Sequence, residues 1–166
     1  HEGHAIQILA GNRRQLVASP HYLSRFGSPK LVSDLAAHKL VTVENGLDSN
    51  EWHFKDAKQN ISTFKARGYL RLDSGDAILR CILNDGGLAM LPTYIVGRHI
   101  TSGALLPLLE TLVDERTPIH AVWRQKNHRL PKIEAFLAFL QQLYGDIPYW
   151  DAVTEENKKA AMRASK

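Results

Sequence analysis

Short apolar runs alternate with amphipathic segments along most of the chain, and this pattern predicts strands that alternate with helices. Apolar or alternating runs predict strands at residues 5–9, 13–18, 40–43, 52–54, 61–66, 69–72, 105–109 and 119–123, and another directly before Pro92. Helical spacing and capping signals predict helices at residues 20–26, 29–38, 76–85, 93–100 and 132–144. The predicted fold class is therefore α/β.

The stretch from residue 68 to residue 92 contains the clearest unit of this pattern. A short strand, a capped turn, a helix and a second apolar strand follow one another, which is typical of a βαβ unit in a parallel sheet. Ser74 supplies an N-cap oxygen, Asp76 is an acid in the first helical turn, and Gly86 and Gly87 end the helix. The apolar side of this helix is wide, which predicts that the helix is covered on most sides.

Polar residues follow two of the predicted strands and are candidates for a ligand site. In an open α/β sheet, ligands bind at the carboxyl ends of strands and at the N-termini of the helices that follow. Asp73, Ser74 and Asp76 stand at one such point, and Glu44 and Asn45 stand at another. The alternative for Ser74 and Asp76 is that they only cap their helix.

Several local signals predict where helices, strands and turns begin and end. Ser19 before Pro20 predicts a helix start, and Gly27 predicts its end. A turn is expected at residues 11–12. Ser33 is expected to cap the short helix predicted at residues 29–38. Pro107 favours an edge position for its strand. The last helix carries an apolar stripe: Ile133, Phe136, Leu137, Leu140, Leu143 and Tyr144.

Composition sets bounds on the class of protein. The 166 residues are 44% hydrophobic and 23% charged, with a net charge of +4, which fits a soluble globular domain or two small lobes. The positive charges are scattered and indicate no nucleic-acid-binding face. No apolar run is long enough for a membrane span, and the single cysteine, Cys81, fits the cytoplasm. The eight histidines show no ligand spacing, and no glycine-rich phosphate loop occurs, so neither a metal nor a cofactor is predicted.

A set of residues in fixed order resembles the sensor domain of LysR-type transcriptional regulators. The matching residues are Asn12, Arg13, Arg14, Leu16, Ala18, Ser19, Pro20, Tyr22, Leu23, Gly27, Pro29, Asp34, Leu35, His38, Trp52, Phe54, Gly68, Leu70, Gly86, Leu88, Ala89, Leu91 and Pro92. The predicted helix at residues 132–144 resembles the last helix of the family as well, so the resemblance extends from about residue 11 to residue 144. The resemblance implies a two-lobe fold similar to periplasmic binding proteins, with the first lobe incomplete in this chain. Residues 1–12 would be a remnant of that lobe, residues 13–91 the second lobe, residues 92–147 the return to the first, and residues 148–166 a polar tail.

The resemblance also implies partners and a binding site. A small polar or anionic effector would bind between the lobes at Ser74, Asp76, Asp73, Glu44, Asn45, Pro92 and Thr93. The chain would form a homodimer or homotetramer, and DNA would be bound only by a winged helix-turn-helix domain that these residues do not contain. Without the opening strands of the first lobe, the apolar stripe of the last helix would lack part of its partner surface, which predicts poor solubility, strand exchange or tight pairing with a second copy.

Two other functions are compatible with a two-lobe α/β fold. The first is a free-standing solute-binding protein. The second is an enzyme that uses Asp73, Asp76 or Cys81, although no set of nucleophile, base and orienting group is evident in the sequence. The prediction from the sequence is therefore a sensor domain and not an enzyme.

Overall fold

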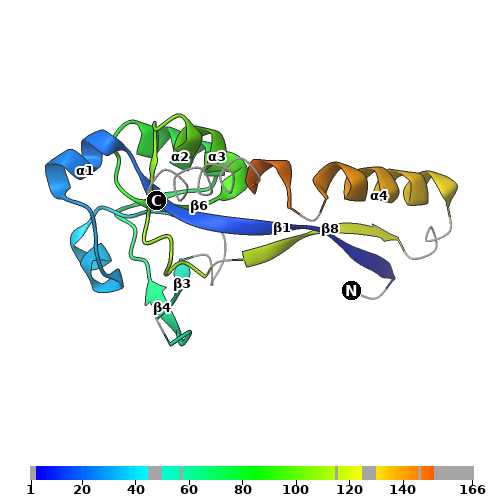
Figure 1. The fold of residues 1–166 in the computed structure, drawn as a ribbon, viewed down its shortest axis with the longest axis horizontal. Coiled ribbons are helices and arrows are strands. Elements are labelled where there is room, and N and C mark those ends of the chain that lie inside the picture. The colour runs from blue at the N-terminus through cyan, green and yellow to red at the C-terminus, as the bar shows by residue number, and fades with distance from the viewer. Residues whose placement is uncertain are drawn as a thin grey trace, which may run out of the picture. The chain divides into compact units, whose positions relative to one another are not determined.

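A computed structural model describes residues 3–44, 50–56, 58–114, 116–124, 130–145 and 147–151. These residues form a mixture of helices and strands, which confirms the predicted α/β class (Figure 1). The chain divides into two compact units. Unit 1 comprises His1–Asn12 and Arg116–Lys166, and unit 2 comprises Arg13–Glu115.

Strand β1 (His4–Ala18) is the longest strand among the described residues. Its second half pairs antiparallel with β6 (Ala89–Pro92) and β7 (Leu106–Leu108), and Leu16 is opposite both Met90 and Leu108. The predicted turn at residues 11–12 is wrong, because β1 runs straight through it. Strand β8 pairs with β1, and the side-chain amide of Asn12 donates to Thr117 Oγ1 of β8 at 3.1 Å. This pairing keeps the backbone of residues 11–12 extended.

The parallel part of unit 2 contains β2 (Val41–Val43) and β5 (Leu70–Leu72), with Val41 opposite Leu70. A parallel bridge joins Leu40 to Leu88, directly before β6. Strand β2 therefore lies between the two strands of the predicted βαβ unit. Helix α2 (Gly75–Leu83) connects β5 to β6, and α3 (Thr93–Thr101) follows β6 without a loop.

Helix α1 (Pro20–Phe26) begins and ends as its sequence predicts. The hydroxyl of Ser19 accepts the backbone N–H of Tyr22 at 3.0 Å, and the helix ends at Gly27, which has a φ of 80°. The predicted helix at residues 29–38 is a shorter 3₁₀ helix, η1 (Val32–Ala37). The prediction that Ser33 caps this helix is wrong. The carboxylate of Asp34 instead accepts hydrogen bonds from the backbone N–H groups of residues 30 and 31, both at 2.8 Å.

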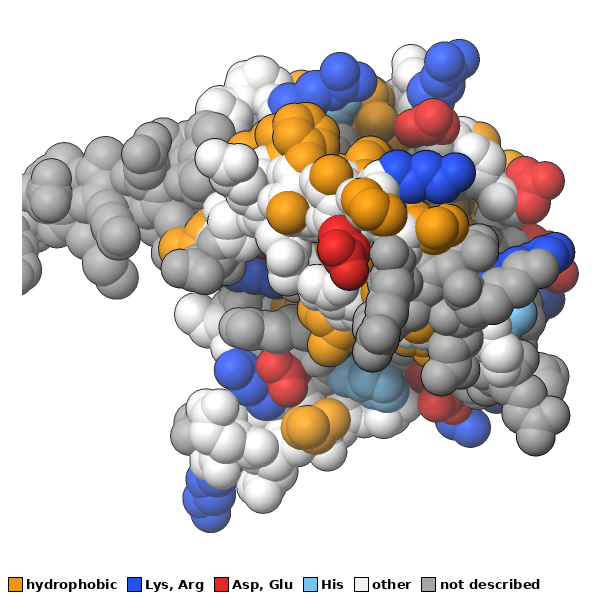
Figure 2. Space-filling model, turned by 90° about the vertical axis from the view of Figure 1, so that its right-hand side faces the viewer, with side chains coloured by type: hydrophobic (Ala, Val, Ile, Leu, Met, Phe, Trp, Pro, Cys, Tyr) orange, Lys and Arg blue, Asp and Glu red, His pale blue; other side chains and the backbone are white. Residues whose placement is uncertain are grey.

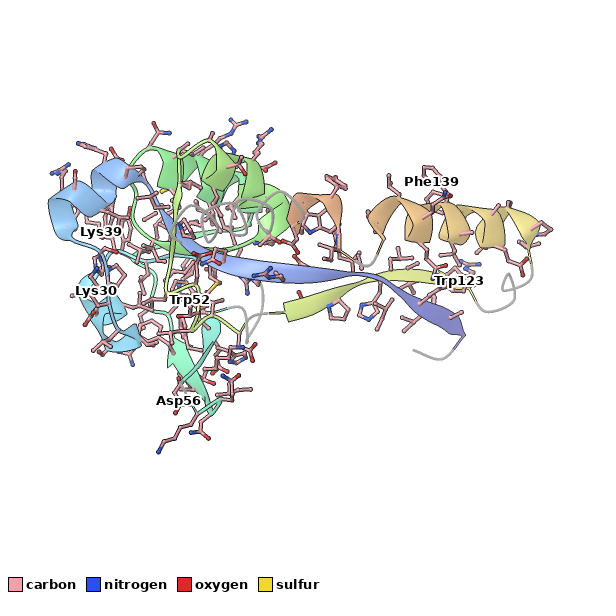
Figure 3. All side chains as sticks on the ribbon, viewed as in Figure 1. Lys30, Lys39, Trp52, Asp56, Trp123 and Phe139 are labelled. Atoms are coloured by element: carbon pink, nitrogen blue, oxygen red, sulfur yellow. The ribbon has the colours of Figure 1, made fainter. Side chains whose placement is uncertain are left out.

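Strands β3 (Glu51–Lys55) and β4 (Ile61–Lys65) form the predicted hairpin. Asp56 lies at its tip, where its carboxylate accepts N–H groups from residues 58 and 60 (Figure 3). Trp52 and Phe54 are buried on the same side of β3 and belong to a core with Leu16 and Leu88. A second core lies under α2 and α3 and consists of Val17, Val41, Ile78, Leu79, Ile82, Ala89, Leu91, Val96 and Leu105. Among the described residues, β7 is an edge strand of its sheet, as Pro107 predicts.

In unit 1, helix α4 (Pro131–Tyr144) runs alongside the pair formed by β1 and β8 (Arg116–Arg124) (Figure 1). Only part of its predicted apolar stripe is covered. Leu137 is buried, but Phe136 and Leu143 are exposed. Phe139 lies on the side of α4 that faces away from the strands (Figure 3). Most of the predicted polar tail, residues 152–166, lies outside the described residues.

Candidate functional site

A hollow of about 430 Å³ lies between the beginning of α2 and the first turns of α3, entirely within unit 2. This volume is in the range of small-molecule sites, about 300–1,000 Å³. Four of its lining residues carry polar or charged side chains and two are aliphatic; the complete lining is Ser74, Gly75, Asp76, Leu79, Tyr94, Ile95 and Arg98.

The α2 side of the hollow follows from the sequence of the first helical turn. Ser74 occupies the N-cap position with extended backbone angles, but its hydroxyl makes no capping hydrogen bond. Asp76 stands in the first turn, where the helix dipole favours a negative charge. Its carboxylate is exposed and makes no ion pair or side-chain hydrogen bond with any described residue. The alternative that Ser74 and Asp76 serve only as side-chain caps therefore finds no support in their contacts.

Gly75 allows α2 to begin close against α3. A Cβ atom at this position would stand 2.8 Å from Cδ1 of Ile95, which is closer than two carbon atoms pack. Leu79, one turn further along α2, is buried and lies on the same side of the helix, because residues four apart in a helix share a face. The glycine and the two aliphatic side chains thus form the apolar part of the hollow.

The α3 side of the hollow presents Tyr94 and Arg98, which are four residues apart and so share one face of the helix. Nε of Arg98 donates to Nε2 of His99 at 3.1 Å. Burial lowers the pKa of the His99 imidazole, and the neighbouring guanidinium lowers that pKa further. The imidazole is therefore neutral at pH 7 and can accept this hydrogen bond. The contact anchors the guanidinium at Nε, and its terminal nitrogens have no partner among the described residues.

Of the six predicted effector-binding residues that the structure describes, two, Ser74 and Asp76, line the hollow. Asp73 is exposed beside the hollow but does not line it. Glu44 is exposed, and its carboxylate lies 3.9 Å from Arg71, a weak surface pair. Asn45 lies outside the described residues.

The other two predicted residues stand at the start of α3. Pro92 occupies the N-cap position of that helix. Thr93 is buried, and its hydroxyl donates to the carbonyl of Arg13 at 3.1 Å. Thr93 therefore links α3 to β1, and its hydroxyl is already engaged.

Sequence reasoning missed the α3 side of the hollow. Tyr94 and Arg98 have the spacing of neighbours on one helical face, which is a visible signal. Which face of α3 turns toward α2 depends on packing between segments that are distant along the chain. Among the described residues, no group of three or more His, Cys, Asp or Glu side chains is placed to hold a metal ion.

Comparison with known proteins gives the family. The sequence model of the family described as "LysR substrate binding domain" matches residues 1–145, and the chain belongs to this family. It is 29% identical over 139 residues to the HTH-type transcriptional regulator CrgA of Neisseria meningitidis serogroup C, which covers 83% of this chain and 46% of CrgA. It is 28% identical over 134 residues to the HTH-type transcriptional activator TtdR of Escherichia coli K12, which covers 80% of this chain and 43% of TtdR. The chain thus spans less than half the length of these curated relatives.

Solved structures agree with this family. The CrgA regulatory domain superposes with a TM-score of 0.77 at 28% sequence identity, over 87% of this chain and 71% of that domain. The full-length virulence activator AphB of Vibrio cholerae shares the fold, with a TM-score of 0.74 at 18% identity over 86% of this chain and 48% of AphB. The predicted resemblance to LysR-type regulators is confirmed. These relatives are transcriptional regulators, and they give no support to a free-standing solute-binding protein. No described helix is long and apolar enough to cross a membrane.

Proposed function

We propose that this chain is the effector-sensing part of a LysR-type transcriptional regulator, and that the hollow between α2 and α3 forms part of its effector site. The observation that carries this proposal is the placement of Asp76 and Arg98 on one hollow in a member of this family, since neither charged side chain has an ionic partner among the described residues. Charged groups without partners in a concave site are available to a ligand.

The position of the hollow in the sheet supports the proposal. Strands β2 and β5 are parallel, so their carboxyl ends lie at the same edge. Helix α2 begins three residues after the last residue of β5, which places Ser74 and Asp76 at that edge. Ligands of open α/β sheets bind at this edge. Asp73 and Glu44 lie at the same strand ends and are proposed to contribute at the rim of the site.

The mechanism we propose is a shift between two arrangements of a two-lobe sensor. The effector would favour the arrangement in which it touches both lobes, and the coupling can be no larger than its preference for that arrangement. Such couplings are typically about 1–3 kcal/mol. In a longer polypeptide that assembles as a dimer or tetramer, this shift would alter the spacing of separate DNA-reading domains. The proposed role is regulatory and involves no catalysis by Asp73, Asp76 or Cys81.

A thermal-shift screen with small polar metabolites tests the proposal. A true effector at about one hundred times its Kd should raise Tm by about 5 °C or more. Asp76→Asn and Arg98→Gln should reduce that shift. Glu134→Gln removes a matched first-turn acid from α4, and Lys30→Gln removes an exposed cation outside the hollow; neither should reduce it. Equal shifts in all four variants would contradict a site at the hollow, and a screen without any stabilising metabolite would contradict the sensor function.

A further inference from the structure

We infer that the hollow between α2 and α3 is built for a zwitterionic ligand, an amino acid with an apolar side chain. Its ammonium group would pair with Asp76, and its carboxylate would pair with Arg98. This inference rests on the proposed function and adds the chemical class of the effector.

The first support is the presence of opposite charges on one small site. Asp76 comes from α2 and Arg98 comes from α3, and both line the same hollow. They do not form an ion pair with each other or with any other described residue. Two unlike charges that line one hollow and remain unpaired leave both signs available to a bound molecule.

The second support is that ligands of a single charge fit this site poorly. A simple carboxylate at Arg98 would bring a negative charge near Asp76, and a simple amine at Asp76 would bring a positive charge near Arg98. Each would gain one attraction and meet one repulsion. A zwitterion meets only attractions, so the same two residues select for it and against both of its halves.

The third support is the apolar part of the lining. Leu79, Ile95 and Tyr94 all line the hollow; Leu79 is buried, Ile95 packs against Gly75, and Tyr94 is about half exposed. An aliphatic or aromatic side chain would bury apolar surface there, which stabilises a complex in proportion to the area removed from water. Amino acids with charged or strongly polar side chains would lose this contribution.

Matched probes separate the zwitterion from its halves. Leucine would be compared with 4-methylpentanoate, which lacks the ammonium group, and with isopentylamine, which lacks the carboxylate. Phenylalanine, 3-phenylpropanoate and phenethylamine form a second set with a larger side chain. Titration calorimetry on the full chain should show at least one of the two amino acids binding about tenfold or more tightly than both of its halves.

Variants then assign each charge to its residue. Asp76→Asn should lower the affinity of the amino acid to that of its carboxylate half, and Arg98→Gln should lower it to that of its amine half. Both side chains are exposed, so circular dichroism and Tm should show that the variants fold like the parent chain. Gly75→Ala adds a methyl group against Ile95 and should weaken binding of the larger amino acid more than that of the smaller.

The outcomes separate this inference from the proposed function. If a carboxylate or amine half binds as tightly as the parent amino acid, the zwitterion inference is overturned and the sensor function stands. If neither amino acid binds but another metabolite stabilises the chain in a manner that depends on Asp76 or Arg98, the zwitterion inference is again overturned and the sensor function again stands. If no metabolite binds, both are overturned.

Discussion

The two units of the chain differ in how completely they bury their apolar side chains. In unit 2, α2, α3, β2 and β6 enclose a core whose larger members are almost inaccessible to water. In unit 1, Ile8, Phe136 and Phe139 are more than half exposed. Burial of apolar surface is the main source of folding free energy. Among the described residues, unit 2 therefore contributes more apolar burial, and so more stability, than unit 1.

The mixture of side chains on the surface agrees with the charge pattern of the sequence. On the face shown in Figure 2, Lys and Arg side chains are interspersed with Asp and Glu side chains, and hydrophobic side chains are visible between them. A field of one sign that would attract nucleic acid is absent from the described residues on this face.

The largest expected effect on stability comes from truncating one leucine in each unit to alanine. Leu88 of unit 2 is fully buried at 0% exposure, and Leu143 of unit 1 is 51% exposed. Leu88→Ala removes packed methyl groups and leaves a cavity, so it should lower the free energy of unfolding by about 2–5 kcal/mol. Leu143→Ala should cost about 0.5 kcal/mol or less. Urea unfolding measures both, and equal losses would show that unit 1 is packed as well as unit 2.

The second effect comes from matched glycine substitutions. Gly87 in unit 2 has a φ of 132°, and a Cβ there would clash with the carbonyl oxygen of Lys39. Gly11 in unit 1 has no atom within 4 Å of the position of an added Cβ. Gly87→Ala should destabilise the chain by about 2 kcal/mol or more, because both the backbone angle and the contact are unfavourable.

Gly11→Ala is the control, and it should change stability by less than about 1 kcal/mol in either direction. The midpoint of urea unfolding distinguishes the two variants. A loss on Gly11→Ala as large as that on Gly87→Ala would mean that unit 1 packs tightly around β1.

Local signals explain which parts of the fold could be predicted from the sequence. Ser19, Pro20 and Gly27 act within one helix, so both ends of α1 were predicted correctly. The turn expected at residues 11–12 failed, because β8 pairs with β1 from more than a hundred positions away and Asn12 reaches Thr117. Tertiary pairing overrode the local turn preference there.

The same distinction applies to the candidate site. Ser74 and Asp76 were identified because a helix start is a local feature of the sequence. The sequence does not predict Arg98 as a lining residue, since its place on the hollow depends on the packing of α3 against α2. The predicted site residue Thr93 shows the converse: its position at a helix start was visible in the sequence, but its bond to the carbonyl of Arg13 was not.

The third effect concerns the cap that joins α1 to the end of α2. The hydroxyl of Ser19 accepts the N–H of Tyr22 at 3.0 Å and donates to the carboxylate of Asp85 at 2.5 Å. Ser19→Ala removes both bonds from a buried position and should cost about 1–2 kcal/mol. Ser33→Ala is the matched control, because Ser33 is exposed and caps nothing. A cost for Ser33→Ala equal to that for Ser19→Ala would contradict the observed capping pattern.

The smallest effect is a dependence of stability on pH, and it also belongs to unit 2. Burial lowers the pKa of His38 and of His99 below the ordinary value of 6.5; the carboxylate of Asp34 partly opposes this shift at His38, and the guanidinium of Arg98 adds to it at His99. The unfolded chain therefore takes up protons at a higher pH than the folded chain does. Stability should be constant above pH 6.5, fall as the pH decreases below that value, and level off once both lowered pKa values have been passed.

Urea midpoints measured from about pH 8 to about pH 5 should show this fall, and it should be shallower in the double variant His38→Gln with His99→Gln. A second fall is expected below pH 3.8, because hydrogen bonds lower the pKa of Asp85, from Ser19 and His21, and that of Asp34, from backbone N–H groups. All of these groups belong to unit 2. If the double variant loses stability with the same slope between about pH 6.5 and pH 5, the acid sensitivity must arise from groups other than these two histidines.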